Sequence, residues 1–227
     1  MTDQGGHVVL KCSGDACGMR YPSPADDPRR NACPLCESPV SQVATFSPPP
    51  DLSAQRVEAT GEIVAVLDNV RSALNVGTMM RSADGAALDH LYLGGLTAPA
   101  DNPKVIKTAL GAQQAVPCSS WLDLLPALQH LRDKGYEIWA VDYTSTSTRM
   151  QTIAARPPRV AFVVGNERAG VDPEILATAD RHVHVDMHGT KSTLNVGVAF
   201  SLVAYWLRGL PLEATPETNA ARSHRQP

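Results

Sequence analysis

The sequence contains no apolar run close to the roughly 20 residues that a membrane-spanning helix requires. Its first residues, MTDQGGHVVLKC, also lack a basic stretch followed by an apolar one, so they do not resemble a secretory signal peptide. These two absences predict a cytoplasmic protein that has no membrane as a partner.

An excess of positive charge is missing as well. Lysine and arginine together number 20 against 23 acidic residues, which gives a formal net charge of −3. A chain of this charge does not bind nucleic acid through bulk electrostatics alone. If RNA is the partner, local basic patches and shape have to provide the binding.

Several common site motifs are absent. The stretch Gly165–Gly170 is followed by Val171 and Asp172 rather than by Lys-Ser/Thr, so it is not a phosphate-binding P-loop. No G-x-G-x-x-G fingerprint follows a predicted strand, and no G-x-S-x-G elbow is present. His182 and His184 would share one face of a short strand, where exposed or hydrogen-bonded imidazoles are favoured over metal ligands.

Composition divides the chain into four parts. Residues 1–46 are rich in cysteine and have no long apolar periodicity. Residues 47–56 begin Ser-Pro-Pro-Pro and predict a stiff linker. Residues 57–210 alternate apolar runs with helical patterns. Residues 211–227 are poor in apolar side chains and predict a disordered tail.

Four cysteines in the first part have the spacing of a zinc site. The pattern is C-x4-C, fifteen residues, then C-x2-C, formed by Cys12, Cys17, Cys33 and Cys36. Two close pairs separated by a loop suit tetrahedral zinc, and four cysteine ligands leave no open position, so a structural zinc ion is expected. Disulfides or unrelated thiols are the alternative, which a reducing cytosol disfavours. We expect Cys118, which stands alone, to serve packing.

The third part predicts an α/β fold with a mostly parallel sheet and helices on both faces. The predicted strands are Glu62–Leu67, His90–Leu93, Tyr136–Val141, Arg159–Val164 and Arg181–Val185. The predicted helices are Val76–Ala87, Pro103–Gly111, Trp121–Lys134, Pro173–Ala179 and Leu194–Leu207. The continuous apolar run Val160–Val164 indicates a strand buried on both sides.

Three polar loops follow strands of this domain. Leu67–Arg81 leads from a strand into a helix for which Asn75 is a candidate N-cap. Val163–Val171 holds Glu167 between two glycines. The alternative to a functional loop here is an ordinary turn, in which Glu167 forms a surface ion pair with Arg168. Val185–Ala199 leads into an apolar helix that Ser192 or Thr193 could cap. Open α/β sheets place ligands at the carboxyl ends of their strands, where all three loops lie.

In this order, the three loops resemble the SpoU branch of the SPOUT RNA methyltransferases. Asn75 and Arg81 match an N-x5-R arrangement, and Gly165, Asn166, Glu167 and Gly170 match G-N-E-x-x-G. The third family motif, M-x-G-x3-S-L-N-V, is matched by Met187, Gly189, Leu194, Asn195 and Val196. The chain departs from that motif at Thr193, where the family usually has serine. The resemblance covers roughly residues 57–210.

The resemblance implies a C-terminal trefoil knot, a homodimer and a site for S-adenosylmethionine. The cofactor-binding positions that it implies are Val164, Gly165, Asn166, Gly170, Val185, Met187, Leu194 and Asn195. The reaction that it implies is methyl transfer to a ribose 2′-hydroxyl of tRNA or rRNA. The catalytic positions that it implies are Arg81, Asn75, Glu167, Thr193 and Asn195, with Arg81 acting on the hydroxyl proton or on an RNA phosphate.

Two other readings of the chain remain. It could be a non-catalytic RNA-binding protein on the same fold, or a protein-interaction module that uses its zinc ribbon. In the methyltransferase reading, the cysteine-rich module is an RNA-docking appendage, with Arg20, Arg29 and Arg30 as candidate phosphate contacts.

Overall fold

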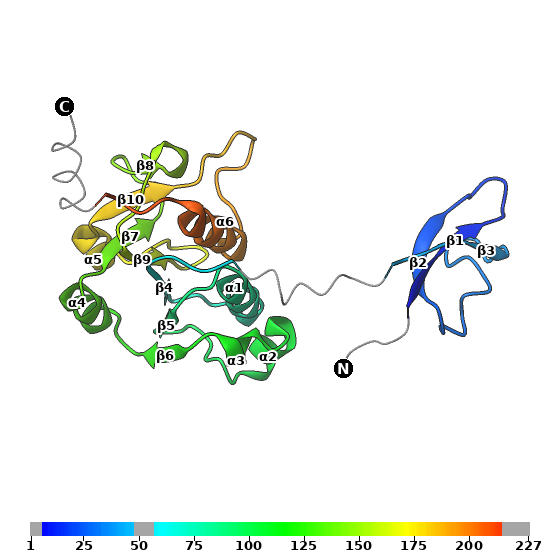
Figure 1. Ribbon diagram of the computed structural model, residues 1–227, viewed down its shortest axis with the longest axis horizontal. Coiled ribbons are helices and arrows are strands. Elements are labelled where there is room, and N and C mark those ends of the chain that lie inside the picture. Colours follow the sequence, from blue (N-terminus) through cyan, green and yellow to red (C-terminus); the bar gives the residue numbers. More distant parts are fainter. Residues whose placement is uncertain (1–5, 48–56, 215–227) are drawn as a thin grey trace, which may run out of the picture. The chain divides into compact units, whose positions relative to one another are not determined.

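The computed structural model describes residues 6–47 and 57–214, which form two compact units divided between Val57 and Glu58 (Figure 1). Each unit has a sheet of its own. Ser47 is the only residue of the predicted linker that is described, since residues 48–56 lie outside the described ranges. Residues 215–227 of the predicted tail lie outside them as well. Within the described ranges, no helix is long and apolar enough to cross a membrane.

The smaller unit is a three-stranded antiparallel sheet in the order β2-β1-β3, with β1 at His7–Cys12, β2 at Arg20–Pro24 and β3 at Val40–Thr45. Along β1, Val8, Leu10 and Cys12 are buried, while the side chains between them point to the other face. Few apolar residues are buried in this unit. Its core is therefore too small to account for its folding without another source of stability.

The larger unit contains a seven-stranded sheet in which every pair of neighbours is parallel. The order is β6 (Cys118–Trp121), β5 (His90–Gly94), β4 (Glu62–Asp68), β9 (Arg159–Val164), β7 (Glu137–Val141), β10 (Arg181–His184) and β8 (Thr148–Arg149). The predicted α/β class is confirmed. Strands β6 and β8 were not predicted from the sequence.

Helices cover both faces of this sheet. They are α1 (Ala73–Gly85), α2 (Pro103–Ala109), α3 (Ala112–Ala115), α4 (Leu125–Asp133), α5 (Pro173–Thr178) and α6 (Val196–Gly209), with a 3-10 turn, η2, at Met150–Thr152. Ile63, Ala65 and Leu67 of β4 pack with α1, α2 and α6, whereas Val64 and Val66 pack with α4 and α5. Figure 1 shows α1 and α6 on one side of the sheet and α4 and α5 on the other.

Central strands of the sheet are buried on both faces. All five residues of Val160–Val164 are at most 1% exposed, as the apolar run predicts. β9 lies between β4 and β7. From the β4–β9 pair, the sheet extends through β5 and β6 on one side and through β7, β10 and β8 on the other. Crevices form at the carboxyl ends of strands where the winding reverses. The trefoil knot stays a prediction.

The end of α6 is tied to the start of the domain by a buried arginine. Arg156 is fully buried, and its guanidinium donates to the carbonyls of Leu207, Pro157 and Thr60. Its backbone N–H donates to Pro211, and its carbonyl accepts from Glu213. Residues 211–213, which the sequence assigns to the tail, therefore pair with the folded domain.

Candidate functional site

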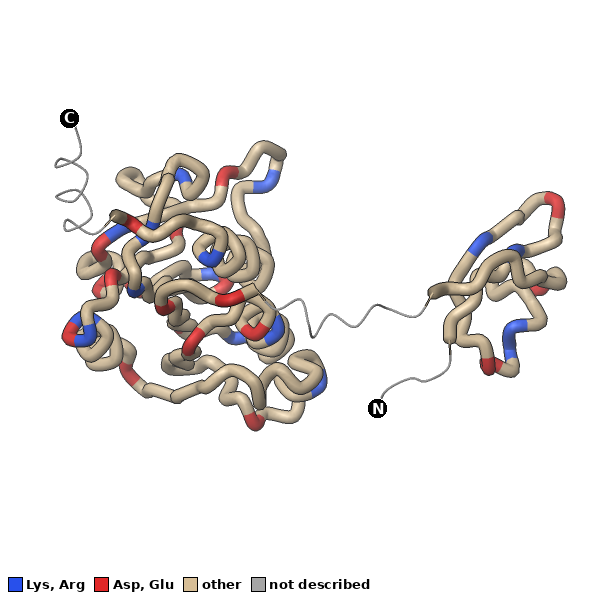
Figure 2. The backbone as a smooth tube through the Cα atoms, viewed as in Figure 1, with Lys and Arg blue, Asp and Glu red and all other residues tan. Residues whose placement is uncertain are grey.

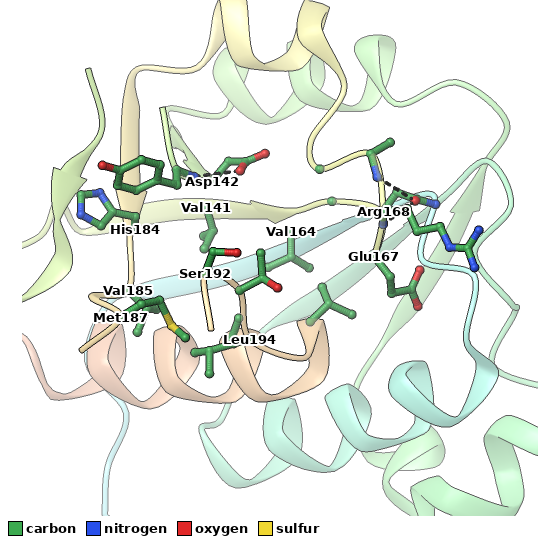
Figure 3. Close-up of a pocket in the computed structure, with 18 residues that line it drawn as sticks. Val141, Asp142, Val164, Glu167, Arg168, His184, Val185, Met187, Ser192 and Leu194 are labelled. Atoms are coloured by element: carbon green, nitrogen blue, oxygen red, sulfur yellow. Dashed lines mark hydrogen bonds between the residues drawn. The ribbon is translucent and has the colours of Figure 1, made fainter. Parts of the chain in front are cut away.

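A pocket of about 340 Å³ lies at the carboxyl ends of β7, β9 and β10. Three segments line it: the end of β7 with the two residues after it, the loop after β9, and the chain from β10 to the start of α6. Figure 3 shows Val185, Met187 and Leu194 near one end of the pocket and Glu167 with Arg168 near the other. Seven of the eight predicted cofactor positions line this pocket: Val164, Gly165, Asn166, Gly170, Val185, Met187 and Leu194.

The loop Gly165–Gly170 closes on itself. Asn166 and Gly170 exchange backbone hydrogen bonds of 2.8 and 3.0 Å. A Cβ atom on Gly165 would lie 2.2 Å from the backbone of Gly170, a separation that a folded chain cannot accommodate. Gly170 adopts a φ of +78°, which favours glycine. Both glycines are therefore needed for the loop to form this wall of the pocket.

Glu167 organises the polar side of the site. Its carboxylate accepts hydrogen bonds of 3.0 Å from the backbone N–H groups of Arg71 and Ser72 and from the Asn75 amide. Burial raises the pKa of Glu167, but these hydrogen bonds outweigh it and hold the pKa below its ordinary value of 4.5. The structure contains no Glu167–Arg168 ion pair. The carboxylate instead fixes the loop before α1.

Asn75 and Asn195 meet at the same place. The Asn195 amide donates to Asn75 Oδ1 at 3.2 Å, and Asn195 Oδ1 accepts from the backbone N–H groups of Gly197 and Val198. Asn195 is therefore the N-cap of α6, not Ser192 or Thr193. The N-cap of α1 is Ser72, so the expectation for Asn75 was wrong; its side chain is engaged by Glu167 and Asn195 instead.

The predicted catalytic residues are only partly brought together. Asn75, Glu167 and Asn195 form one hydrogen-bonded group, and Thr193 lines the pocket. The Thr193 hydroxyl has no hydrogen bond with another described residue. Arg81 is exposed on α1 and, among the described residues, has no hydrogen-bond or ion-pair partner.

Asp142, which follows β7 and lines the pocket, was not predicted from the sequence. Its carboxylate accepts from the backbone N–H of Val171 at 3.0 Å and from that of Tyr143 at 2.8 Å. A Cβ atom on Gly170 would lie 2.5 Å from Asp142 Oδ2. Asp142 thus holds the glycine loop against the end of β7. Its position directly after the predicted strand Tyr136–Val141 was the feature of the sequence that could have identified it as a site residue.

Two histidines of β10 take part in hydrogen bonds, as the sequence favours. His182 Nε2 lies 2.8 Å from the Leu176 carbonyl oxygen, and His184 Nδ1 lies 2.9 Å from Ser147 Oγ. His184 lines the pocket, with the Tyr143 ring packed edge-on at 5.0 Å. Neither histidine belongs to a candidate metal cluster in the described part of the chain.

The smaller unit gathers its four cysteines into one cluster. The sulfur atoms of Cys12, Cys17, Cys33 and Cys36 all lie within 4.8 Å of one another, and all four thiols are free. The Cys12–Cys36 and Cys17–Cys33 sulfur separations are 3.4 and 3.8 Å. Tetrahedral zinc with Zn–S bonds of about 2.3 Å requires separations of about 3.8 Å. The donor set and its geometry fit a structural zinc ion.

Local structure supports this cluster. Gly18 has a φ of +57°, as the turn after the first cysteine pair requires. The Gly14 N–H donates to Cys12 Sγ at 3.3 Å. Hydrogen bonds from the side chain and backbone of Ser38 lower the pKa of Cys36 to about 6. The donors directed at Cys36 Sγ favour its thiolate form, which is the form that a metal binds.

The model of the SpoU rRNA methylase family matches residues 62–205, which contain the sheet, the glycine loop and most of α6. This chain belongs to the SpoU rRNA methylase family. It is 31% identical over 180 residues to the 23S rRNA (guanosine(2553)-2'-O)-methyltransferase RlmP of Bacillus subtilis, a match that covers 77% of this chain and 71% of that protein.

Two solved structures of RNA-modifying enzymes agree with this assignment. An AdoMet-bound rRNA methyltransferase from Sinorhizobium meliloti has a TM-score of 0.62 and 26% identity, covering 66% of this chain and 56% of that one. The TrmH/SpoU tRNA modifying enzyme of A. aeolicus has a TM-score of 0.59 and 25% identity, covering 66% of this chain and 75% of that one. The family predicted from the three motifs is confirmed.

Proposed function

We propose that this SpoU-family protein transfers a methyl group from S-adenosylmethionine to a ribose 2′-hydroxyl of RNA. The observation that carries the proposal is the pocket formed by the second and third motifs, with the Glu167–Asn75–Asn195 group beside it. Relatives named as rRNA and tRNA methyltransferases support both the cofactor and the substrate class. The substrate is a tRNA or an rRNA.

The pocket residues fit the cofactor. Val164, Val185, Met187 and Leu194 offer apolar walls for the adenine and for the carbons attached to the cofactor's sulfur. The Gly165–Gly170 loop brings backbone close to the cavity without a side chain in the way. When bound, S-adenosylmethionine supplies a methyl group on a positively charged sulfur, which makes that carbon an electrophile.

The residues of this chain have to place the 2′-oxygen in line with that carbon and help its proton leave. A guanidinium stays protonated under physiological conditions and is a poor base, so we assign Arg81 to an RNA phosphate through a bidentate contact. Asn75, Glu167, Thr193 and Asn195 shape the site around the ribose. Transfer would join the methyl carbon to the 2′-oxygen and leave the cofactor's sulfur as a neutral thioether, and the hydroxyl proton would pass to solvent.

We also propose that the protein forms a homodimer. Helices α1 and α6 lie side by side, joined by a Ser82–Ser201 hydrogen bond of 2.6 Å. Their outer surfaces expose four apolar side chains, at 44–57% exposure: Leu74, Val198, Leu202 and Tyr205. Apolar patches of this kind on packed helices mark protein interfaces. Arg81 lies two turns from Leu74 on the same face of α1, so association through this face carries Arg81 into the interface.

We place the protein in the cytoplasm, where RNA is available and the four free thiols stay reduced. The test is transfer of labelled methyl from S-adenosylmethionine to total bacterial RNA, followed by mapping of the modified nucleotide. Label on a ribose is the expected result. If calorimetry detects no binding of S-adenosylmethionine, the protein is a binding module on a methyltransferase fold instead.

A further inference from the structure

The small sheet has a second, outward face that carries two adjacent cations. Lys11 of β1 lies directly opposite Arg20 of β2 in the antiparallel register and directly opposite Ser41 of β3. Side chains that face each other across an antiparallel pair point to the same side of the sheet. Both cations are exposed, whereas the neighbouring Leu10 and Cys12 point to the buried side with the metal site.

These two cations have no acidic partner. The strands β1, β2 and β3 contain no aspartate or glutamate, and among the described residues neither the Lys11 nor the Arg20 side chain has a hydrogen-bond or ion-pair partner. The acidic residues of residues 6–47 all lie in loops: Asp15, Asp26, Asp27 and Glu37. Figure 2 shows Lys/Arg segments on the strands of this unit and Asp/Glu segments in its loops.

The other arginines of the module are already engaged. Arg29 forms an ion pair with Asp27 at 3.2 Å, and Arg30 donates to the Ala25 carbonyl at 2.5 Å. They are therefore poor candidates for the phosphate contacts that the sequence suggested for them. Arg20 lies in β2 and not in the loop.

We propose that the outward face of this sheet, centred on Lys11 and Arg20, binds the phosphate backbone of the RNA substrate. Like charges directly opposite each other on a sheet destabilise it, and an anion that bridges them removes that repulsion. The face offers charge without a base-reading side chain between the two cations, so it contributes affinity rather than sequence choice. This inference rests on the proposed RNA substrate.

The test is the double variant Lys11→Gln/Arg20→Gln in the full-length protein, with bulk tRNA and ribosomal RNA as separate probes. Binding is measured between roughly 50 and 200 mM salt. For the probe that contains the substrate, we expect the binding affinity to fall about 10- to 100-fold. The slope of the logarithm of the binding constant against the logarithm of the salt concentration should shrink in magnitude by about 1.5–2. Zinc content and calorimetric affinity for S-adenosylmethionine should stay at wild-type values.

The matched control is Arg29→Gln/Arg30→Gln, which removes the same charge from the same module. The inference is overturned if the control loses as much RNA affinity as the test variant, or if the test variant keeps the wild-type slope. If polyglutamate at an equal concentration of charge displaces the RNA, the face binds acidic proteins, and the inference is overturned. If the wild type methylates RNA while the test variant binds it normally, this inference fails alone. If the wild type binds neither RNA nor cofactor, the proposed function fails.

Discussion

Glu167 acts at the scale of single residues by fixing backbone that lies far from it in sequence. Its carboxylate accepts from two consecutive N–H groups, those of Arg71 and Ser72, which are 96 and 95 residues away. The same carboxylate orients Asn75, which in turn meets Asn195. One side chain therefore joins all three motifs, and its charge state controls the loop before α1.

Replacing Glu167 with glutamine should destabilise the larger unit by about 1 kcal/mol at neutral pH. Hydrogen bonds to a charged acceptor contribute about 1.5–3 kcal/mol, and exposure to solvent reduces that value. Because the pKa of Glu167 is lowered on folding, its contribution is present above pH 4.5 and is lost as the pH falls through the folded pKa. Urea unfolding followed by tryptophan fluorescence measures this, since Trp121, Trp139 and Trp206 all lie in the larger unit. A gap between the two proteins that does not narrow as the pH falls below 4.5 would contradict the assignment.

Arg81→Ala should reduce methyl transfer by at least about 100-fold, the usual loss when a preorganised charged donor is removed. Affinity for S-adenosylmethionine should stay within about twofold, because Arg81 does not line the pocket. Arg81→Lys keeps the charge but loses the planar fork, so it should recover only part of the rate. Single-turnover assays and calorimetry separate the two effects. Full activity in Arg81→Ala would remove Arg81 from the mechanism.

The spacing of the cysteines predicted their cluster, and the family resemblance implied positions that line the pocket. Residue patterns were less successful with helix caps. Ser72 and Asn75 are both good N-caps three residues apart. The choice between them depends on Glu167, which the chain brings near only when the sheet forms. Asp142 was missed for the same reason, since its partners Val171 and Gly170 come from another strand end.

At the scale of elements, the glycine loop is the least tolerant segment. Gly165→Ala places a methyl group about where the Gly170 backbone lies, so the two ends of the loop have to separate. We expect cofactor affinity to fall at least about 10-fold, with a loss of stability of about 1–3 kcal/mol from overpacking. Gly189→Ala is the control, because a Cβ atom at Gly189 meets nothing within 4 Å. Equal effects of the two variants would show that loop closure does not matter.

Helix α6 buries one face against the sheet and leaves the other apolar and exposed. Leu202→Glu should convert the proposed dimer to a monomer, because a charge in the centre of a hydrophobic interface costs several kcal/mol unless it is paired. Leu122→Glu is a matched control, since Leu122 is 97% exposed in the loop after β6. Sedimentation velocity at several concentrations distinguishes the two. A wild type that sediments as a monomer would contradict the dimer outright.

Element boundaries followed tertiary contacts more than local pattern. Helix α4 begins at Leu125, because Trp121 pairs in β6 with Gly94, and a Trp121–Lys134 helix is excluded. Strand β8 has two exposed residues, Thr148 and Arg149, which leave no periodicity to detect. It exists because β10 offers it an open edge.

At the scale of the whole molecule, the two units draw on different sources of stability. The larger unit buries a core on both faces of its sheet, whereas the smaller unit buries few apolar side chains around a cysteine cluster. Structural zinc contributes about 10–16 kcal/mol to small modules of this kind. We therefore expect a strong chelator at neutral pH to unfold residues 7–46 and to leave the larger unit folded.

Amide NMR spectra of the chelated protein should lose the dispersed resonances of residues 7–46, while the thermal midpoint seen by tryptophan fluorescence stays the same. Cys33→Ser should reproduce this loss at ambient metal, because three thiolates bind zinc far less tightly than four. Cys118→Ser should not, since Cys118 lies outside the cluster and its thiol donates to the Val116 carbonyl. If the N-terminal spectrum of a metal-free sample is unchanged, the module folds without metal, and its small core is sufficient after all.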